Sequence, residues 1–207
     1  MKWLCFFAVL PLAAQVPDIS GVWLPQHISN LAPAASVSLL PAAKAQFQAN
    51  SGKRPETDAR CLPPGVPRIM LQSRPFEIVQ DSNRILFLFE GGGHVWRQIW
   101  MDDRAQPKDP NPDWLGHSIG HWEAATLVVD TVGFNNQTWL DDSGLPHSEQ
   151  LHVIEKFTRT APGKMKYSVR IDDPGAYSKP WESSSILTFQ PAARLAEDIC
   201  LDKPPAR

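Results

Sequence analysis

The chain has 207 residues, a formal net charge of −2 at pH 7 and a hydrophobic content of 43%. Neither sign of charge dominates, so the composition lacks the basic footprint of a nucleic-acid-binding protein. Its 20 prolines and eight tryptophans favour a loop-rich β protein and argue against a helical bundle. The length predicts one domain with a substantial apolar core.

The first 14 residues have the pattern of a signal peptide. Lys2 supplies the positive start, residues 3–12 form an apolar stretch too short to span a bilayer, and Ala13 and Ala14 are small enough for cleavage. We therefore expect cleavage after Ala14, export, and a single domain over residues 15–207. No later stretch reaches the apolar length of a membrane helix, so we expect no membrane span.

The secondary structure is predicted in chain order as follows. A short strand covers 16–23, and a helix covers 38–49, with Ser38 as its cap and Pro41 in its first turn. A loop rich in proline and charge follows at 52–67. Period-two alternation then predicts strands at 75–80, 84–90, 94–101, 116–122, 126–132, 151–160, 164–172 and 184–190. A short C-terminal helix is predicted at 191–201.

In two of these strands the side chains alternate between two faces as follows. The alternation at 94–101 groups Val95, Arg97 and Ile99 on one face and His94, Trp96, Gln98 and Trp100 on the other. The strand at 151–160 groups Leu151, Val153, Glu155 and Phe157.

A meander of about eight short strands predicts an all-β fold, an antiparallel up-and-down barrel of the lipocalin or calycin kind, with short N- and C-terminal helices. A two-sheet sandwich is the main alternative. Gly21 and Trp23 match the G-x-W that opens many lipocalin-type barrels, where the tryptophan plugs the closed end. An ordinary core tryptophan is an equal alternative.

The connections between the strands alternate between short and long. Short turns are predicted at 91–93, 123–126 and 161–163, and long loops at 102–116, 133–150 and 173–183. Successive connections of an antiparallel meander lie at opposite ends, so we expect the long loops to form one mouth that binds a small molecule. The expected ligand-binding residues are Trp114, Asn135, Trp139, Asp141, Asp142, His147, His152, Tyr177 and Trp181. The aromatic residues among them could equally cover the core.

A hairpin register predicts a candidate catalytic group. A turn at 123–126 pairs Trp122 with Leu127, which places His117, His121 and Asp130 on one face. We expect that face to line the barrel cavity. A carboxylate beside an imidazole is a plausible general acid–base unit. The alternatives are a structural polar pair or a solvent-facing strand, and a one-residue slip would reverse the faces.

The histidine spacing does not predict a metal site. His117 and His121 lie about 13 Å apart on an extended strand, too far to share one ion. His147 and His152 could fold together with a loop carboxylate into an open three-ligand site. Scattered loop polarity is the favoured interpretation, so we predict no metal and no cofactor.

Four segments resemble recurrent blocks of a family of uncharacterised exported bacterial proteins. They are CLPPGVPRIM at 61–70, RPFEIVQ at 74–80, the long block GHSIGHWE…LHVIEKF at 116–157, and IDDPGAYSKPW at 171–181. The family has a Gly-Asp turn where this chain has Ala124 and Ala125. The resemblance covers most of 18–200 and implies a bacterial periplasmic or extracellular location. It implies no activity.

These observations favour an exported barrel that binds a small, partly apolar molecule. The first alternative is an enzyme, a lyase, isomerase or hydrolase, that uses His117, His121 and Asp130, with help from His147 or His152. The second is a structural or interaction domain of the cell envelope. The chain has no nucleophile elbow, phosphate loop or dinucleotide fingerprint, which disfavours those enzyme classes. The ligand and the oligomeric state stay open.

Once the signal peptide is removed, only two cysteines remain, Cys61 and Cys200. In an oxidising compartment two cysteines most simply form one disulfide, although two buried thiols are the alternative. The bond would join the segment before the 75–80 strand to the C-terminal segment.

We predict that thiol titration of the unfolded, unreduced mature protein finds no free thiol. The same protein titrated after reduction should give two. Two free thiols without reduction would reject the Cys61–Cys200 bond.

Overall fold

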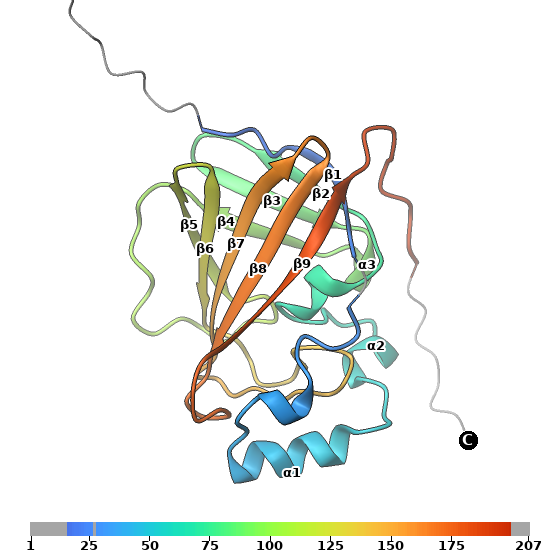
Figure 1. Ribbon diagram of the computed structural model, residues 1–207, viewed down its shortest axis with the longest axis vertical. Coiled ribbons are helices and arrows are strands. Elements are labelled where there is room, and N and C mark those ends of the chain that lie inside the picture. The colour runs from blue at the N-terminus through green and yellow to red at the C-terminus, as the bar shows by residue number, and fades with distance from the viewer. Residues whose placement is uncertain (1–15, 27, 200–207) are drawn as a thin grey trace, which may run out of the picture.

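The computed structural model describes residues 16–26 and 28–199 and has one closed barrel of nine strands (Figure 1). The predicted all-β barrel class is confirmed. Its nine strands correspond to the nine strand segments predicted individually, one more than the barrel of about eight strands that was expected. The strands are β1 (Gly21–Pro25), β2 (Phe76–Gln80), β3 (Arg84–Phe89), β4 (Trp96–Trp100), β5 (His117–Glu123), β6 (Thr126–Val132), β7 (His152–Ala161), β8 (Lys164–Asp172) and β9 (Trp181–Phe189). The predicted signal peptide and Cys200 lie outside the described residues. The signal peptide and the Cys61–Cys200 disulfide therefore stay predictions.

The helical segments are short: η1 (Ala34–Ser36), α1 (Pro41–Asn50), α2 (Glu56–Ala59), η2 (Arg68–Leu71) and α3 (Gly91–His94). The helix predicted at 38–49 is α1, but its N-cap residue is Leu40 and Ser38 does not cap it. None of the described helices is both long and apolar enough to cross a membrane.

The C-terminal helix predicted at 191–201 is wrong for the described part, 191–199, which has a turn and then no regular structure. The segment is held to the barrel instead. The backbone N–H of Ala196 donates to Glu90 Oε2 at 2.8 Å, and that of Asp198 donates to His94 Nε2 at 2.6 Å. A short helix without a packed apolar face is marginal in water, and these bonds favour an extended course.

Large side chains fill the barrel interior. Phe76, Phe87, Phe157 and Tyr167 are fully buried, and their neighbouring ring centroids lie 5.2–5.5 Å apart. They belong to one apolar cluster that runs through the barrel. Trp23 is also fully buried, and its indole N–H donates to the Ile19 carbonyl at 2.9 Å.

The barrel has two different ends. The turn end has the tight connections at 81–83, 124–125 and 162–163, and the loop end has the segments 26–75, 133–151 and 173–180. In Figure 1 the turn end is uppermost and α1 lies below the loop end. In the 124–125 turn Ala124 has a φ of 52°, which lies in the left-handed region that favours glycine.

One strand pair breaks the antiparallel meander. β4 and β5 are parallel, whereas the other eight neighbouring pairs are antiparallel. The 101–116 connection must therefore run from the turn end to the loop end, along the outside of the barrel (Figure 1). The prediction that all three long loops open at one end is wrong for this loop. Its last part, with Trp114, still reaches the loop end, because Asp113 bridges to Phe134 there.

Candidate functional site

The parallel seam between β4 and β5 opens into a groove of about 530 Å³. The two strands pair only at Ile99 with Ser118 and at Trp100 with Ile119. On the loop-end side of this contact the two strands are not paired. We call the resulting hollow the seam groove. It is lined by Pro63, His94, Val95, Trp96, Arg97, Gln98, Trp100, Asp113, Trp114, Leu115, Gly116, His117 and Ser118.

Three tryptophans give the seam groove an aromatic wall. Trp96 is 60% exposed, which is unusual for so large an apolar side chain. Trp100 lies under the Arg104 guanidinium, whose carbon is 3.6 Å from the ring centroid. Trp114, which belongs to the 101–116 connection, also lines the groove and is half-buried. Exposed rings around a hollow provide a large, rigid contact area for an apolar ligand.

A buried charged network meets the groove from inside the barrel. Arg97 points inward, where its Nε donates to Ser118 Oγ at 3.0 Å. Its Nη2 donates to Thr131 Oγ1 at 2.8 Å and to Glu155 Oε2 at 2.5 Å. The other oxygen of Glu155 accepts from the Tyr167 hydroxyl at 2.9 Å. Burial and the Glu155 charge raise the pKa of Tyr167 well above its usual range, so it stays a donor.

Two donors of the seam groove have no partner among the described residues. They are Nη1 of Arg97 and Nε2 of Gln98, both of which are buried. Leaving a buried donor unpaired costs about 1–3 kcal/mol, more for a charged group. A structure that keeps two such donors beside one hollow is suited to a ligand with hydrogen-bond acceptors.

The hairpin that carries the predicted catalytic residues has the expected strand register. The face with His117, His121 and Asp130, however, points out of the barrel and not into it. Trp122 pairs with Leu127, His121 with Val128, and His117 with Val132, as the turn predicted. The expectation that His117, His121 and Asp130 line the barrel cavity is wrong. Ser118 and Thr131, on the other face, point inward, whereas the His121 side chain is 54% exposed.

Outside the barrel Asp130 nevertheless binds a histidine. His152 Nε2 lies 3.0 Å from Asp130 Oδ2, and Gln106 Nε2 donates to Asp130 Oδ1 at 2.7 Å. The other end of the Gln106 amide contacts His117 Nδ1 at 3.1 Å. His121 contacts Glu123 instead, at 3.4 Å. The structure thus joins His117, Gln106, Asp130 and His152 in one half-exposed chain of hydrogen bonds.

The charges of this chain support each other. The hydrogen bond with Asp130 raises the pKa of His152, and partial burial opposes it only in part. Burial also acts to raise the pKa of Asp130, but the bonds from His152 and Gln106 outweigh it, so the net pKa is lowered. Such a pair can hold or transfer a proton near neutral pH.

The loops predicted to form a mouth are mostly packed. Asp141 is fully buried and accepts from the backbone N–H groups of Leu31 and Ser143 at 2.8 and 3.0 Å. The Tyr177 hydroxyl donates to the Pro146 carbonyl, and burial raises its pKa. His147 bonds Thr138 Oγ1 at 2.7 Å, and burial lowers its pKa. These three predicted ligand-binding residues close the loop end and do not line an open mouth.

The remaining predicted mouth residues have other surroundings. Asp142 forms an ion pair with Arg68 at 2.7 Å, and the Asn135 side chain accepts from the Gln137 backbone. Trp181 packs against Tyr177 with ring centroids 5.6 Å apart, and Trp139 is partly buried. Trp114 is the one predicted ligand-binding residue among the residues that line the seam groove. His117, a predicted catalytic residue, lines it too.

The possible metal site at His147 and His152 does not form. His147 bonds within its own loop, whereas His152 bonds Asp130 on the outer sheet face. Within residues 16–26 and 28–199, no group of three or more histidine, cysteine or acidic side chains is arranged to hold a metal ion.

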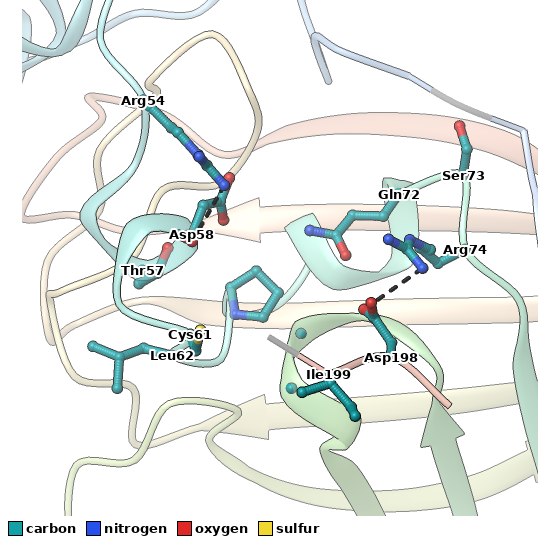
Figure 2. A pocket seen from close by; sticks show the side chains of 14 residues that line it. Arg54, Thr57, Asp58, Cys61, Leu62, Gln72, Ser73, Arg74, Asp198 and Ile199 are labelled. Atoms are coloured by element: carbon teal, nitrogen blue, oxygen red, sulfur yellow. Dashed lines mark hydrogen bonds and ion pairs between the residues drawn. The ribbon is translucent and has the colours of Figure 1, made fainter. Parts of the chain in front are cut away.

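A second hollow of about 530 Å³, the polar pocket, lies near Cys61 (Figure 2). Figure 2 shows Arg74 paired with Asp198, and Arg54 bonded to Asp58. No aromatic side chain is among its described lining residues. Since its two arginines are already engaged within the chain, the seam groove is the stronger candidate. Cys61 and Ile199 both line this pocket. The Cys61–Cys200 disulfide stays a prediction, because Cys200 lies outside the described residues.

Sequence analysis did not single out Arg97, Glu155, Trp96 and Trp100. A signal for the first two was present. Arg97 and Glu155 carry opposite charges, and each stands in the apolar phase of a strand. A buried charge must be paired, so two such positions predict each other. No sequence pattern indicated a binding role for Trp96 and Trp100, because they line a groove only through the parallel pairing of β4 with β5.

Comparison with known protein-family models and with curated protein sequences finds no match to this chain. The resemblance to an exported bacterial family therefore stays a prediction. The site is interpreted from its own geometry.

We predict that the imidazole C–H signals of His152 titrate in NMR spectra with a midpoint above the 6.5 of an ordinary histidine. Asp130→Asn should lower the midpoint, because the largest cause of the raised pKa is removed. Asp172→Asn, opposite His152 on β8, is the matched control and should lower it less, since that carboxylate acts only through its charge. Equal effects of both changes would contradict the pairing.

The same pKa directions fix the pH range in which the pair stabilises the fold. The His152 contribution is complete below its unfolded pKa near 6.5 and is lost as pH rises through the raised folded pKa. The Asp130 contribution is complete above its unfolded pKa near 3.8 and is lost as pH falls through the lowered folded pKa. The pair should therefore stabilise the protein most between these two pH values.

Proposed function

We propose that this protein binds a small, partly apolar molecule in the seam groove. The observation that carries the proposal is that three tryptophans, Trp96 exposed and Trp100 and Trp114 half-buried, line one hollow whose lining also includes buried donors without a partner among the described residues. Burying an aromatic ring against such a wall releases water from apolar surface on both partners. The volume of about 530 Å³ suits a ligand of small-molecule size.

The proposed site moves from the loop mouth to the side of the barrel. The loop end is packed by buried residues such as Asp141, His147 and Tyr177, so a ligand there would have to displace the core. At the seam, the short pairing of β4 with β5 leaves the wall open without any displacement. A rigid barrel around an open seam is a pre-formed site, which keeps the entropy cost of binding low.

A second candidate function is general acid–base catalysis on the outer sheet face. The observation that favours it is the contact of His152 with Asp130, which raises the histidine pKa. The pair of His152 with Asp130, outside the barrel, takes the place of the predicted group of His117, His121 and Asp130 inside it. Asp130 and His121 line an adjacent hollow of about 420 Å³, which could admit a substrate. Binding at the seam groove is the leading candidate, because three tryptophans line it, whereas none is among the described lining residues of the hollow beside Asp130.

We also propose that the mature protein acts outside the cytoplasm, in the bacterial periplasm or the extracellular space. The signal-peptide pattern at 1–14 and the resemblance to blocks of exported bacterial proteins support this location.

The first test uses N-phenyl-1-naphthylamine, an uncharged apolar dye whose fluorescence rises on leaving water. The dye should bind the protein, and Trp96→Ala should weaken binding at least about fivefold, which corresponds to about 1 kcal/mol. Because Trp96 is largely exposed, its removal should leave the unfolding midpoint nearly unchanged.

The matched control is Val79→Ala, which removes another exposed apolar side chain, 42% exposed on β2, away from the groove. This variant should bind the dye like the parent. Absence of dye binding, or equal affinity of the Trp96→Ala, Trp114→Ala and parent proteins, would overturn the proposal.

A further inference from the structure

The hydrogen bonds that Arg97 already makes restrict which ligands the seam groove can bind. This inference rests on the proposed function. Three of the five guanidinium N–H groups are used, by Ser118, Thr131 and Glu155. The two N–H groups of Nη1 have no partner among the described residues. They can donate to an oxygen acceptor of a ligand. Gln98 Nε2 also has no partner among the described residues, but its side chain starts from the opposite face of β4.

The charge of Arg97 is already balanced. The side chains of Arg97 and Glu155 are 1% and 0% exposed, and they contact each other directly. The pair is therefore neutral as a whole, in surroundings of low dielectric constant. A second carboxylate brought to Nη1 would lose its hydration and leave one net negative charge buried beside Glu155. An uncharged oxygen would accept the same hydrogen bonds without that penalty.

A second arginine of the same chain shows the contrasting case. Arg68 is also buried, but it binds two carboxylates, Asp58 and Asp142, at 2.7 Å each. Both of those carboxylates are partly exposed, with 25% and 37% of their side chains accessible, so water shares their charge. Glu155 has no such access. Two carboxylates on one arginine thus suit Arg68 and do not suit Arg97.

From these observations we infer that the seam groove selects an uncharged, planar aromatic molecule that carries a carbonyl or hydroxyl oxygen. The ring lies against Trp96, Trp100 and Trp114, and the oxygen accepts from Arg97 Nη1. Glu155 and Tyr167 are positioning residues, because they hold the guanidinium in place and do not touch the ligand.

The test compares three probes that share a naphthalene ring: 2-naphthamide, 2-naphthoate and 2-methylnaphthalene. Each competes with N-phenyl-1-naphthylamine at pH 8, where an ordinary histidine is neutral and cannot balance an anion. 2-Naphthamide should displace the dye at a concentration at least about tenfold below either of the others, since one hydrogen bond to a charged group is worth at least that factor.

Glu155→Gln then tests the charge balance. It keeps an acceptor oxygen for Arg97 and turns an amide N–H towards the Tyr167 oxygen, which can accept it. It leaves the guanidinium charge unneutralised, so 2-naphthoate should gain relative to 2-naphthamide by tenfold or more. The matched control is Glu182→Gln, which removes the same charge from an exposed position on β9 and should leave the ratio unchanged. If Glu155→Gln does not fold, the three-probe comparison on the parent protein decides alone.

The failures are distinguishable. If 2-naphthoate or 2-methylnaphthalene competes as well as 2-naphthamide, and Trp96→Ala weakens all three, the proposed uncharged-acceptor class is wrong and binding at the groove stands. If the dye binds and Trp96→Ala weakens it but no probe displaces it, the inference fails and binding at the groove stands. If the dye itself does not bind, both the inference and the proposed function fail.

Discussion

The parallel pairing of β4 with β5 is the constraint on which the rest of the structure depends. An up-and-down barrel of nine strands cannot close with antiparallel pairs alone, because an odd number of alternating strands leaves two neighbours running the same way. Here that mismatch falls at the seam, where only two residue pairs form. Because of this mismatch the 101–116 connection runs along the outside of the barrel, and the barrel wall is open on the loop-end side of the β4–β5 contact. The seam groove is thus a consequence of closure.

The opening at the seam gives the buried network of Arg97, Glu155 and Tyr167 a possible role in ligand binding. In a sealed barrel, an ion pair surrounded by phenylalanines would add little stability, because desolvation offsets the attraction. Beside an open seam, the same pair fixes a guanidinium whose remaining donors can be used by a ligand. Its neutrality as a unit then affects selectivity, since it favours acceptors without charge. Stability and recognition are therefore carried by the same few groups.

The outer sheet face shows how a correct register can lead to a wrong site. The hairpin pairing of 117–132 follows from its two-residue turn, and the structure reproduces it residue by residue. Which face points inward is a separate question, because both faces of this hairpin mix polar and apolar residues. The interior takes Ser118 and Gly120, since a larger side chain at Gly120 would meet Ile99 and Met101. The histidines and Asp130 are left outside, where Asp130 pairs with His152 across strands.

The sequence by itself determined the all-β class, the strand positions to within a few residues, the helix α1 and the hairpin register. These follow from period-two alternation, turn residues and proline placement, which are local properties of the chain. Only the tertiary structure decided the direction of β5 relative to β4, the packed loop end, and the assembly of Trp96, Trp100, Trp114 and Arg97 around one groove. Those features depend on how distant strands close into a barrel, and no local pattern specifies how the ends of a sheet meet.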